Sequence, residues 1–348
     1  MHSFDGHNDV LLRLWKQGGD GAAAFLDGEE RGQLDLPRAR KGGMVGGLYA
    51  IFVPSITKGD RSEPMSEVTY DVPQPPPPEL SHAQRATLEM ASIFFRIAER
   101  SEGGVRPARS VADIRAARTD GAHAPVLHIE GCEALDPDLK FLDVLYAAGL
   151  RSLGPVWSRP NIFGHGVPFR FPSSPDTGDG LTDLGKALIR RCNEMQVLVD
   201  LSHLNEKGFW DVAKISHAPL VASHSNAHTI SQSARNLTDK QLAAIRETGG
   251  LVGVNYAVSF LRPDGKRVPE TPLDVVVDHM AHLVDKLGED GVGLGSDFDG
   301  ALIPKDIGTV ADLPNLIAAM RARQFGEPLI EKICFENWMR VLARTWGE

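Results

Sequence analysis

No stretch of this 348-residue sequence approaches the ~20 consecutive apolar residues that a membrane-spanning helix requires. The first residues also lack the basic segment and the apolar core of a secretory signal peptide. We therefore expect a cytoplasmic protein that has no membrane among its partners.

The sequence is also poor in cysteine and has no cluster of basic residues. Its three cysteines, Cys132, Cys192 and Cys334, lack the paired spacing of a metal site, so we expect reduced, buried thiols. Acidic residues number 46 against 37 lysines and arginines, which gives a formal net charge of −9. This balance argues against nucleic acid as a partner, because binding to phosphates depends on clustered basic side chains.

Apolar runs of strand length alternate with helical patterns along the chain. We predict strands at residues 3–5, 46–53, 124–129, 151–157, 197–201, 219–222, 250–255 and 292–296. Amphipathic segments such as 81–100 and 271–287 lie between them. The alternation predicts an α/β fold, a (β/α)8 TIM barrel with extra C-terminal helices from about Leu313 and Leu329. Such barrels commonly reach this size, so we expect one domain over residues 1–348.

Two connections are long and rich in proline or glycine. Residues 55–79 contain the run Pro75 to Pro78, which favours an extended conformation and predicts a stiff surface insertion. Residues 158–180 contain His165 between two glycines. The length of this second connection is more typical of a lid or substrate loop than of a simple connector.

Two predicted strands end in the same dipeptide, Ser-His, at His203 and His224. A helix-length segment separates them, so they form a β-α-β unit. In a parallel barrel the carboxyl ends of the strands carry the chemistry, so both imidazoles would meet at one mouth. A single histidine there is usually a loop or hydrogen-bonding residue, but two in equivalent positions suggest metal ligands.

Other ligand types occupy equivalent positions on other strands. His7 and Asp9 follow the first strand and, two residues apart, would share one face of an extended segment. Glu130 follows the third strand directly, where a buried carboxylate needs either a metal ion or an arginine partner. Asp297 follows the eighth strand.

The nitrogen and oxygen donors suit zinc best, with cobalt, manganese or iron as alternatives. Five ligands serve two ions well if one carboxylate bridges. We expect His7, Asp9 and Glu130 to hold one ion and Glu130, His203 and His224 to hold the other. Two such ions share a hydroxide that attacks a carbonyl, and Asp297 is then free to act as the base.

The sequence resembles the membrane, or renal, dipeptidases, a family of dizinc barrel peptidases. The resemblance extends in family order over residues 5 to 300. It rests on Asp5-Gly6-His7-Asn8-Asp9, Ile129-Glu130-Gly131, Val199-Asp200-Leu201-Ser202-His203, Ser223-His224-Ser225, Ala234-Arg235-Asn236 and Gly295-Ser296-Asp297-Phe298-Asp299-Gly300.

The resemblance implies two Zn²⁺ per subunit, proton transfer by Asp297 and a small dipeptide as substrate. It also implies that Arg235 binds the carboxyl-terminal carboxylate of that dipeptide, a task that suits the planar guanidinium. From sequence alone Arg235 would more often be a surface arginine, and Asp299 could as easily cap the following turn.

One departure from the family pattern concerns substrate binding. Where the family usually has a histidine that binds substrate and the developing oxyanion, this chain has Trp157. The indole N–H can donate a hydrogen bond but carries no positive charge. Either the role is lost or His165 on the next loop takes it over.

Three functions stay open at this point. The first is hydrolysis of short dipeptides, including L-Xaa-D-Xaa, by a zinc metallopeptidase. The second is a dimetal hydrolase of another amide, a lactam or an ester, and the third is an inactive barrel that binds peptides. The sequence does not fix side-chain preference, and a homo-oligomer is compatible with it.

Overall fold

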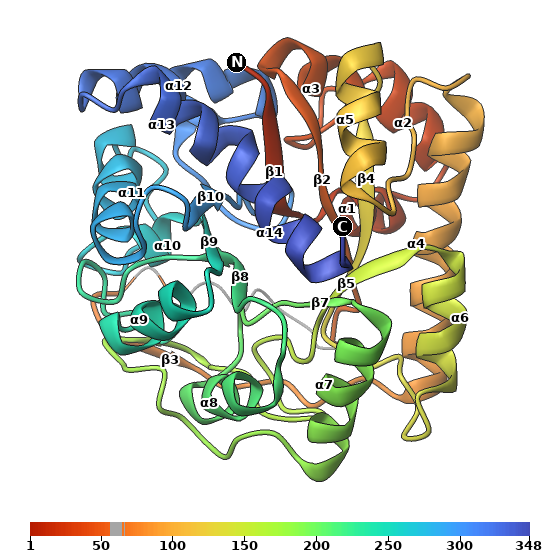
Figure 1. Cartoon of the computed structure of the whole chain (residues 1–348), viewed down its shortest axis with the longest axis vertical. Coiled ribbons are helices and arrows are strands. Elements are labelled where there is room, and N and C mark those ends of the chain that lie inside the picture. Colours follow the sequence, from red (N-terminus) through yellow and green to blue (C-terminus); the bar gives the residue numbers. More distant parts are fainter. Residues whose placement is uncertain (56–64, 66) are drawn as a thin grey trace.

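The computed structural model describes residues 1–55, 65 and 67–348, and its centre is a barrel of parallel strands ringed by helices (Figure 1). All the predicted strands are present, with small shifts at their ends. They are β1 (Ser3–Asn8), β2 (Met44–Phe52), β4 (Ala124–Glu130), β5 (Leu150–Gly154), β7 (Leu198–Val199), β8 (Val221–Ser225), β9 (Leu251–Val254) and β10 (Val292–Leu294).

The strand order is β7-β5-β4-β2-β1-β10-β9-β8, and every neighbouring pair is parallel. A single parallel bridge between Asp200 and Val221 joins the two ends of this sheet. Leu201 N donates to Val221 O at 2.8 Å across the same seam. The sheet therefore closes on itself, which confirms the predicted TIM barrel.

Helices lie on the outside of the barrel and cover the strands. The predicted segments at 81–100 and 271–287 correspond to α4 (Leu80–Arg100) and α11 (Leu273–Leu287), and the segment between His203 and His224 to α8 (Glu206–Ile215). The predicted C-terminal helices correspond to α12 (Leu313–Ala322) and α13 (Glu327–Glu331). The ring also contains α6 (Lys140–Ala148), α7 (Asp183–Met195) and α9 (Asp239–Glu247). Further helices were not predicted from the sequence, namely α1 (Val10–Gln17), α2 (Gly21–Asp27), α3 (Leu36–Gly42), α5 (Val111–Asp120) and the single turn α10 (Val258–Leu261).

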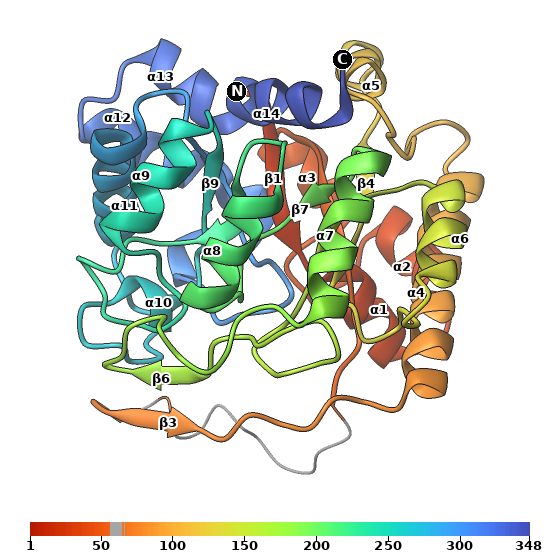
Figure 2. The ribbon, with the colours of Figure 1, turned by 60° about the horizontal axis from the view of Figure 1, so that its bottom comes forward.

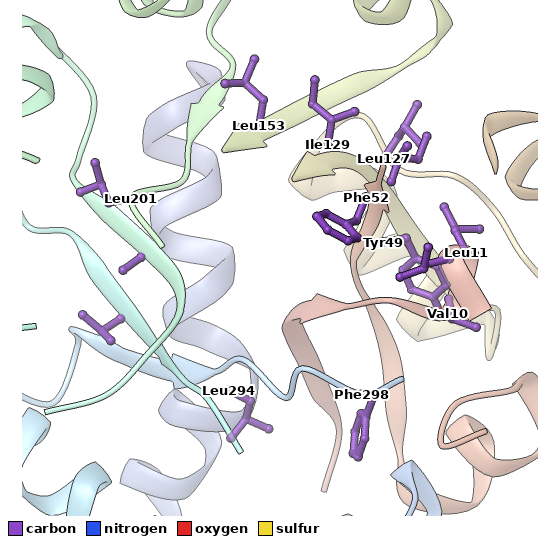
Figure 3. Packing of buried hydrophobic residues seen from close by; sticks show 14 of the residues in the cluster. Val10, Leu11, Tyr49, Phe52, Leu127, Ile129, Leu153, Leu201, Leu294 and Phe298 are labelled. Carbon is purple, nitrogen blue, oxygen red and sulfur yellow. The ribbon is translucent and has the colours of Figure 1, made fainter. Parts of the chain in front are cut away.

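A continuous apolar layer lies between the strands and the helices. Figure 3 shows Tyr49 of β2 beside Val10 and Leu11 of α1, with Leu127 and Ile129 of β4 close by. These side chains are at most 2% exposed, so burial of apolar area holds α1 against the sheet. The residue that precedes α1, Asp9, is thereby held at a fixed place on the barrel.

The C-terminal segment closes the amino-terminal end of the barrel. A π-helical turn (Lys332–Glu336) leads into α14 (Asn337–Trp346), whose Trp338 is fully buried. The Trp338 indole packs 6.1 Å from the Phe4 ring and donates to Leu294 O at 2.9 Å. The extra helices thus seal one end of the barrel and leave the other for chemistry.

Two long connections pair with each other at that other end. Strands β3 (Tyr70–Val72) and β6 (Phe169–Phe171) form a small antiparallel sheet that the sequence did not predict. In Figure 2 this sheet lies at the opposite end of the molecule from α14. Part of the predicted insertion at 55–79, residues 56–64 and 66, lies outside the described residues.

Candidate metal centre at the mouth of the barrel

Ionisable side chains from five strands meet at the carboxyl ends of those strands. His7 lies in β1 and Asp9 just after it, Glu130 ends β4, His203 follows β7, His224 lies in β8 and Asp297 follows β10. All six are at most 9% exposed. The barrel therefore brings together residues that are far apart in the sequence, as predicted.

One carboxylate oxygen lies at the centre of this cluster. Glu130 Oε1 is 2.9 Å from His203 Nε2, 3.4 Å from His224 Nε2 and 3.7 Å from His7 Nε2. The two imidazole nitrogens of His203 and His224 are themselves 3.1 Å apart. Glu130 thus contacts both predicted ligand groups, which is the geometry that a bridging carboxylate needs.

Two of the carboxylates complete the other side of the cluster. Asp9 Oδ2 lies 3.4 Å from His7 Nε2. Ligating atoms of His7, Asp9 and Asp297 lie within 4.8 Å of one another, and the same holds for His7, Glu130 and His224. The cluster therefore contains two overlapping sets of donors, either of which could hold a cation.

Two of the imidazoles are oriented by serine hydroxyl groups. His203 Nδ1 lies 2.7 Å from Ser158 Oγ, and His224 Nδ1 lies 2.7 Å from Ser223 Oγ. Ser223 Oγ in turn donates to Asp200 Oδ2 at 2.5 Å. Because a serine holds Nδ1 in each ring, Nε2 is directed at Glu130, as in histidines that bind metals.

The concentration of buried charge shifts the acid–base properties of the cluster. Burial raises the pKa of Glu130 well above its ordinary range, and Asp9 and Asp297 add to this rise, against the opposing effect of His7. Burial alone would lower the pKa of His7, but Glu130 and Asp9 raise it to about 10. Burial lowers the pKa of His203 and His224 well below the usual value. His203 and His224 are therefore neutral imidazoles, the form that binds a metal. The carboxylates that favour a proton on His7 would equally favour a bound cation.

Unpaired polar atoms also indicate that the cluster binds a cation. His7 Nε2 and Asp9 Oδ1 are buried without a hydrogen-bond partner among the described residues. Such atoms cost about 1–3 kcal/mol each unless they find a partner. Because the donors are imidazole nitrogens and carboxylate oxygens, they fit a divalent transition metal such as zinc.

A cavity of about 250 Å³ opens directly onto this cluster. Asp9, Glu130, His203 and Asp297 form its polar wall. Its apolar wall is made by large side chains, namely Leu12, Phe52, Met65, Trp157, Phe169, Phe260 and Leu302. The two walls together enclose a small, partly apolar cavity next to the side-chain atoms that could bind a metal.

Trp157 faces this cavity, at the position where the resembled family usually has a histidine. Its ring centroid lies 4.9 Å from that of Phe52 and 5.8 Å from that of His203. The buried guanidinium of Arg159 lies 5.4 Å from the Trp157 ring and pairs with Glu133 at 2.8 Å. The indole is therefore a packed part of the site wall.

His165 lies elsewhere. It lines a neighbouring hollow of about 610 Å³ together with Gln74 and Arg170, and that hollow shares no lining residue with the cavity at the metal cluster. His165 Nδ1 lies 3.4 Å from Gly180 O. The structure does not bring His165 to Glu130, so this geometry lends no support to a transfer of the missing histidine's role to it.

Arg235 is buried beside the cluster, not on the surface. It donates from Nη2 to His224 O at 3.0 Å and from Nη1 to Ser225 Oγ at 3.4 Å. Its guanidinium lies 5.3 Å from the centroid of Phe260, which lines the cavity. Arg235 Nε is buried without a hydrogen-bond partner among the described residues, so at least this donor is left for a ligand.

The structure also adds residues that sequence reasoning missed. Asn255, which follows β9, donates to Asp297 Oδ2 at 2.9 Å. Asp5 accepts from Ser296 N and Oγ and so ties β1 to the turn that carries Asp297. The signal of Asn255 was its place directly after a strand, but asparagine there is common in ordinary turns. The contacts of Asp299 are not those of a cap on the following turn: it accepts from Gln33 N and pairs with Arg13 at 3.0 Å.

His128 is a further buried histidine in the barrel. It lies in β4 two residues before Glu130, and its ring is 5.6 Å from that of His7. His128 therefore faces the barrel interior beneath the cluster.

The fold and site together define a TIM barrel with a candidate metal centre at its mouth. Residues 1–346 match the model of the membrane dipeptidases, peptidase family M19, so the chain belongs to that family of metallo-dipeptidases.

The three cysteines are buried and unpaired, as expected. Across the described residues we find no helix that is both long and apolar enough to cross a membrane.

Similar proteins support this assignment. A metallopeptidase of Rhodobacter sphaeroides, liganded with a phosphinate mimic of the dipeptide L-Ala-D-Ala, shares 50% identity and superposes with a TM-score of 0.97 over 99% of both chains. The crystal structure of dipeptidase AC, of family M19, gives 50% identity and a TM-score of 0.98 over 100% of this chain and 99% of that one. An uncharacterized protein from the pqqA 5′ region of Klebsiella pneumoniae is 47% identical over 75% of this chain and 96% of its own.

Proposed function

We propose that this chain hydrolyses dipeptides with two zinc ions that Glu130 bridges. His7 and Asp9 would complete the ligands of one ion, and His203 and His224 those of the other. The observation that carries this proposal is the position of Glu130 Oε1, within 4 Å of the Nε2 atoms of all three histidines. Bound there, the two cations would polarise the peptide carbonyl. They would also lower the pKa of a water molecule toward about 7, so that hydroxide is available at neutral pH.

Asp297 is the residue that we assign to proton transfer. It lines the cavity, and one of its carboxylate oxygens is held by Asn255. Burial raises the pKa of Asp297 above its ordinary range, which makes the carboxylate a better base near neutral pH. Asp297 would take a proton from the attacking water and return it to the leaving amine.

Arg235 and the aromatic wall would bind the dipeptide. The free donor of Arg235 is suited to the carboxyl-terminal carboxylate of the substrate, because guanidinium and carboxylate form strong charge-assisted hydrogen bonds. Trp157 would pack against the substrate as an apolar wall. The cavity of about 250 Å³ leaves little room beyond two residues, so we expect only short substrates to be cleaved.

A relative supports an expectation about the stereochemistry of the substrate. The metallopeptidase of Rhodobacter sphaeroides, at 50% identity, is liganded with a mimic of L-Ala-D-Ala. We therefore expect this chain to cleave L-Xaa-D-Xaa dipeptides. The cytoplasmic location stays a prediction.

A substrate panel tests the proposal. Purified, metal-analysed protein is assayed with L-Ala-L-Ala, L-Ala-D-Ala, the N-acetyl and C-amide forms of each, and the tripeptide. We expect efficient cleavage only where the free amino group, the free carboxylate and the length of two residues are all present, and only slow turnover of the C-amide forms. Equal turnover of the C-amide forms, or of simple lactams and esters, would favour the broader dimetal hydrolase.

A further inference from the structure

His128 is a buried histidine that the proposed reaction does not use. It is fully buried in β4, where its Nδ1 lies 2.9 Å from Ser152 Oγ. Its ring stands edge-on to that of His7, with an angle of 82° between the two planes. Side chains repeat every two residues along a strand, so His128 lies one layer deeper in the barrel than Glu130.

Polar atoms around His128 lack direct partners. Both His128 Nε2 and His7 Nδ1 are buried without a hydrogen-bond partner among the described residues. Asp200 Oδ2 lies 3.9 Å from His128 Nε2, which is too far for a direct hydrogen bond. One nitrogen or oxygen atom from each of His7, His128 and Asp200 lies within 4.8 Å of the other two.

This spacing suits one small molecule with both donor and acceptor capacity. Three atoms at such separations can each lie about 2.8 Å from one central oxygen, a normal hydrogen-bond length. Buried waters typically satisfy two to four polar groups that would otherwise have no partner. Such a water would accept from His7 Nδ1–H and donate its two hydrogens to Asp200 Oδ2 and His128 Nε2. His128 Nδ1–H would then donate to Ser152 Oγ, so the donors and acceptors balance.

The other two imidazoles of the cluster show why His7 needs this partner. Ser158 and Ser223 contact the Nδ1 atoms of His203 and His224 directly and so direct Nε2 toward Glu130. No described residue does this for His7. A metal-binding histidine almost always donates its second N–H to a carboxylate, a carbonyl or water.

We propose that His7, His128 and Asp200 bind one buried water, and that His128 is a positioning residue that orients His7 through this water. The inference rests on the proposed function, since it takes His7 as a metal ligand. A cation in the same place is disfavoured because Asp200 already accepts from Ser202 N, Ser223 N and Ser223 Oγ. A neutral molecule adds no charge to these groups.

Zinc affinity of three variants tests the inference. The enzyme, its His128→Leu variant and its His128→Gln variant are titrated with zinc against a competing chelator. We expect His128→Leu to bind zinc about 10- to 100-fold more weakly, the usual effect of losing a partner of a metal-bound histidine. His128→Gln keeps an acceptor near the position of Nε2 and is expected to recover most of the affinity.

His123→Leu is the matched control. His123 is also buried and lies just before the start of β4, away from the cluster. Its Nε2 lies 2.6 Å from Tyr49 Oη and its Nδ1 3.2 Å from Met44 O. We expect it to lower thermal stability as His128→Leu does while zinc affinity stays unchanged. An equal loss of zinc affinity in both variants would show a general effect of stability and overturn the inference.

Two further results separate this inference from the proposed function. If His7→Ala retains both ions, the proposed metal site itself is wrong. If His7→Ala loses zinc while His128→Leu binds it as tightly as the wild type, only the role of His128 is wrong. A high-resolution crystal structure of the wild type tests the inference even if a variant fails to fold. We expect one water between the three side chains. An anomalous metal signal at that place would overturn the inference.

Discussion

Asn255 Nδ2 donates a hydrogen bond of 2.9 Å to Oδ2 of Asp297, a carboxylate that lies at the edge of the candidate metal cluster and lines its cavity. This contact fixes one oxygen of Asp297 and leaves the other for a proton. Position and hydrogen bonding therefore both agree with a role in proton transfer.

The first prediction concerns Asp297→Asn. The amide keeps the shape of the side chain but cannot accept a proton, so we expect kcat to fall about 10²- to 10⁴-fold. Steady-state kinetics with a dipeptide and metal analysis of the same sample check this. A variant that lost its metal along with its activity would indicate that Asp297 is mainly a ligand.

The second prediction concerns Arg235→Met. Loss of a charge-assisted hydrogen bond of about 1.5–3 kcal/mol should raise KM about 10- to 150-fold for a dipeptide with a free carboxylate. Turnover of a C-amide dipeptide, already slow, should hardly change. If both substrates are affected equally, Arg235 instead supports the site through its contacts with His224 O and Ser225.

The third prediction concerns stability at acid pH. Burial lowers the pKa of His123 from 6.5 to about 4, with a smaller contribution from Arg40. Below pH 6.5 the unfolded chain takes up a proton at His123, whereas the folded protein does so only near pH 4. Stability should thus be lost as the pH falls through this window, by about 3 kcal/mol from this residue.

Denaturant unfolding of the wild type and of His123→Gln between pH 7 and pH 4 checks the third prediction. The variant should be less stable at pH 7 and should lose less stability on acidification, because it has no group that titrates at this position. Parallel curves for the two proteins over the whole range would show that His123 is not held neutral in the folded state.

The fourth prediction concerns the closed end of the barrel. Trp338→Ala removes a fully buried indole that packs on Phe4 and donates to Leu294 O. We expect a loss of about 3–5 kcal/mol in the free energy of unfolding, the usual range for such a truncation in a core. Because Trp338 does not line the cavity at the cluster, kcat of the folded fraction should stay close to that of the wild type.

The barrel and the cluster were predictable from the sequence for one physical reason. Each central strand is an apolar run, and a closed parallel sheet places the residues after those runs at one mouth. His7, Glu130, His203 and His224 could therefore be grouped without coordinates. The pairing of Glu130 with metal or with an arginine could not be decided that way, since both satisfy a buried carboxylate.

Other features depend on contacts that a local pattern does not encode. Strands β3 and β6 have three residues each and become strands only because they pair with each other across a long stretch of sequence. The direction of the loop at 158–180 decides that Trp157 faces the cavity and that His165 faces a separate hollow. The burial of Arg235 likewise depends on how its loop folds back against β8.

The central claim is that Glu130 bridges two metal ions, and anomalous diffraction from crystals of the zinc-loaded protein tests it most directly. Data collected on both sides of the zinc absorption edge should show two peaks, one on each side of Glu130, with His7 and Asp9 beside one and His203 and His224 beside the other. A single peak, or zinc bound away from Glu130, would contradict it.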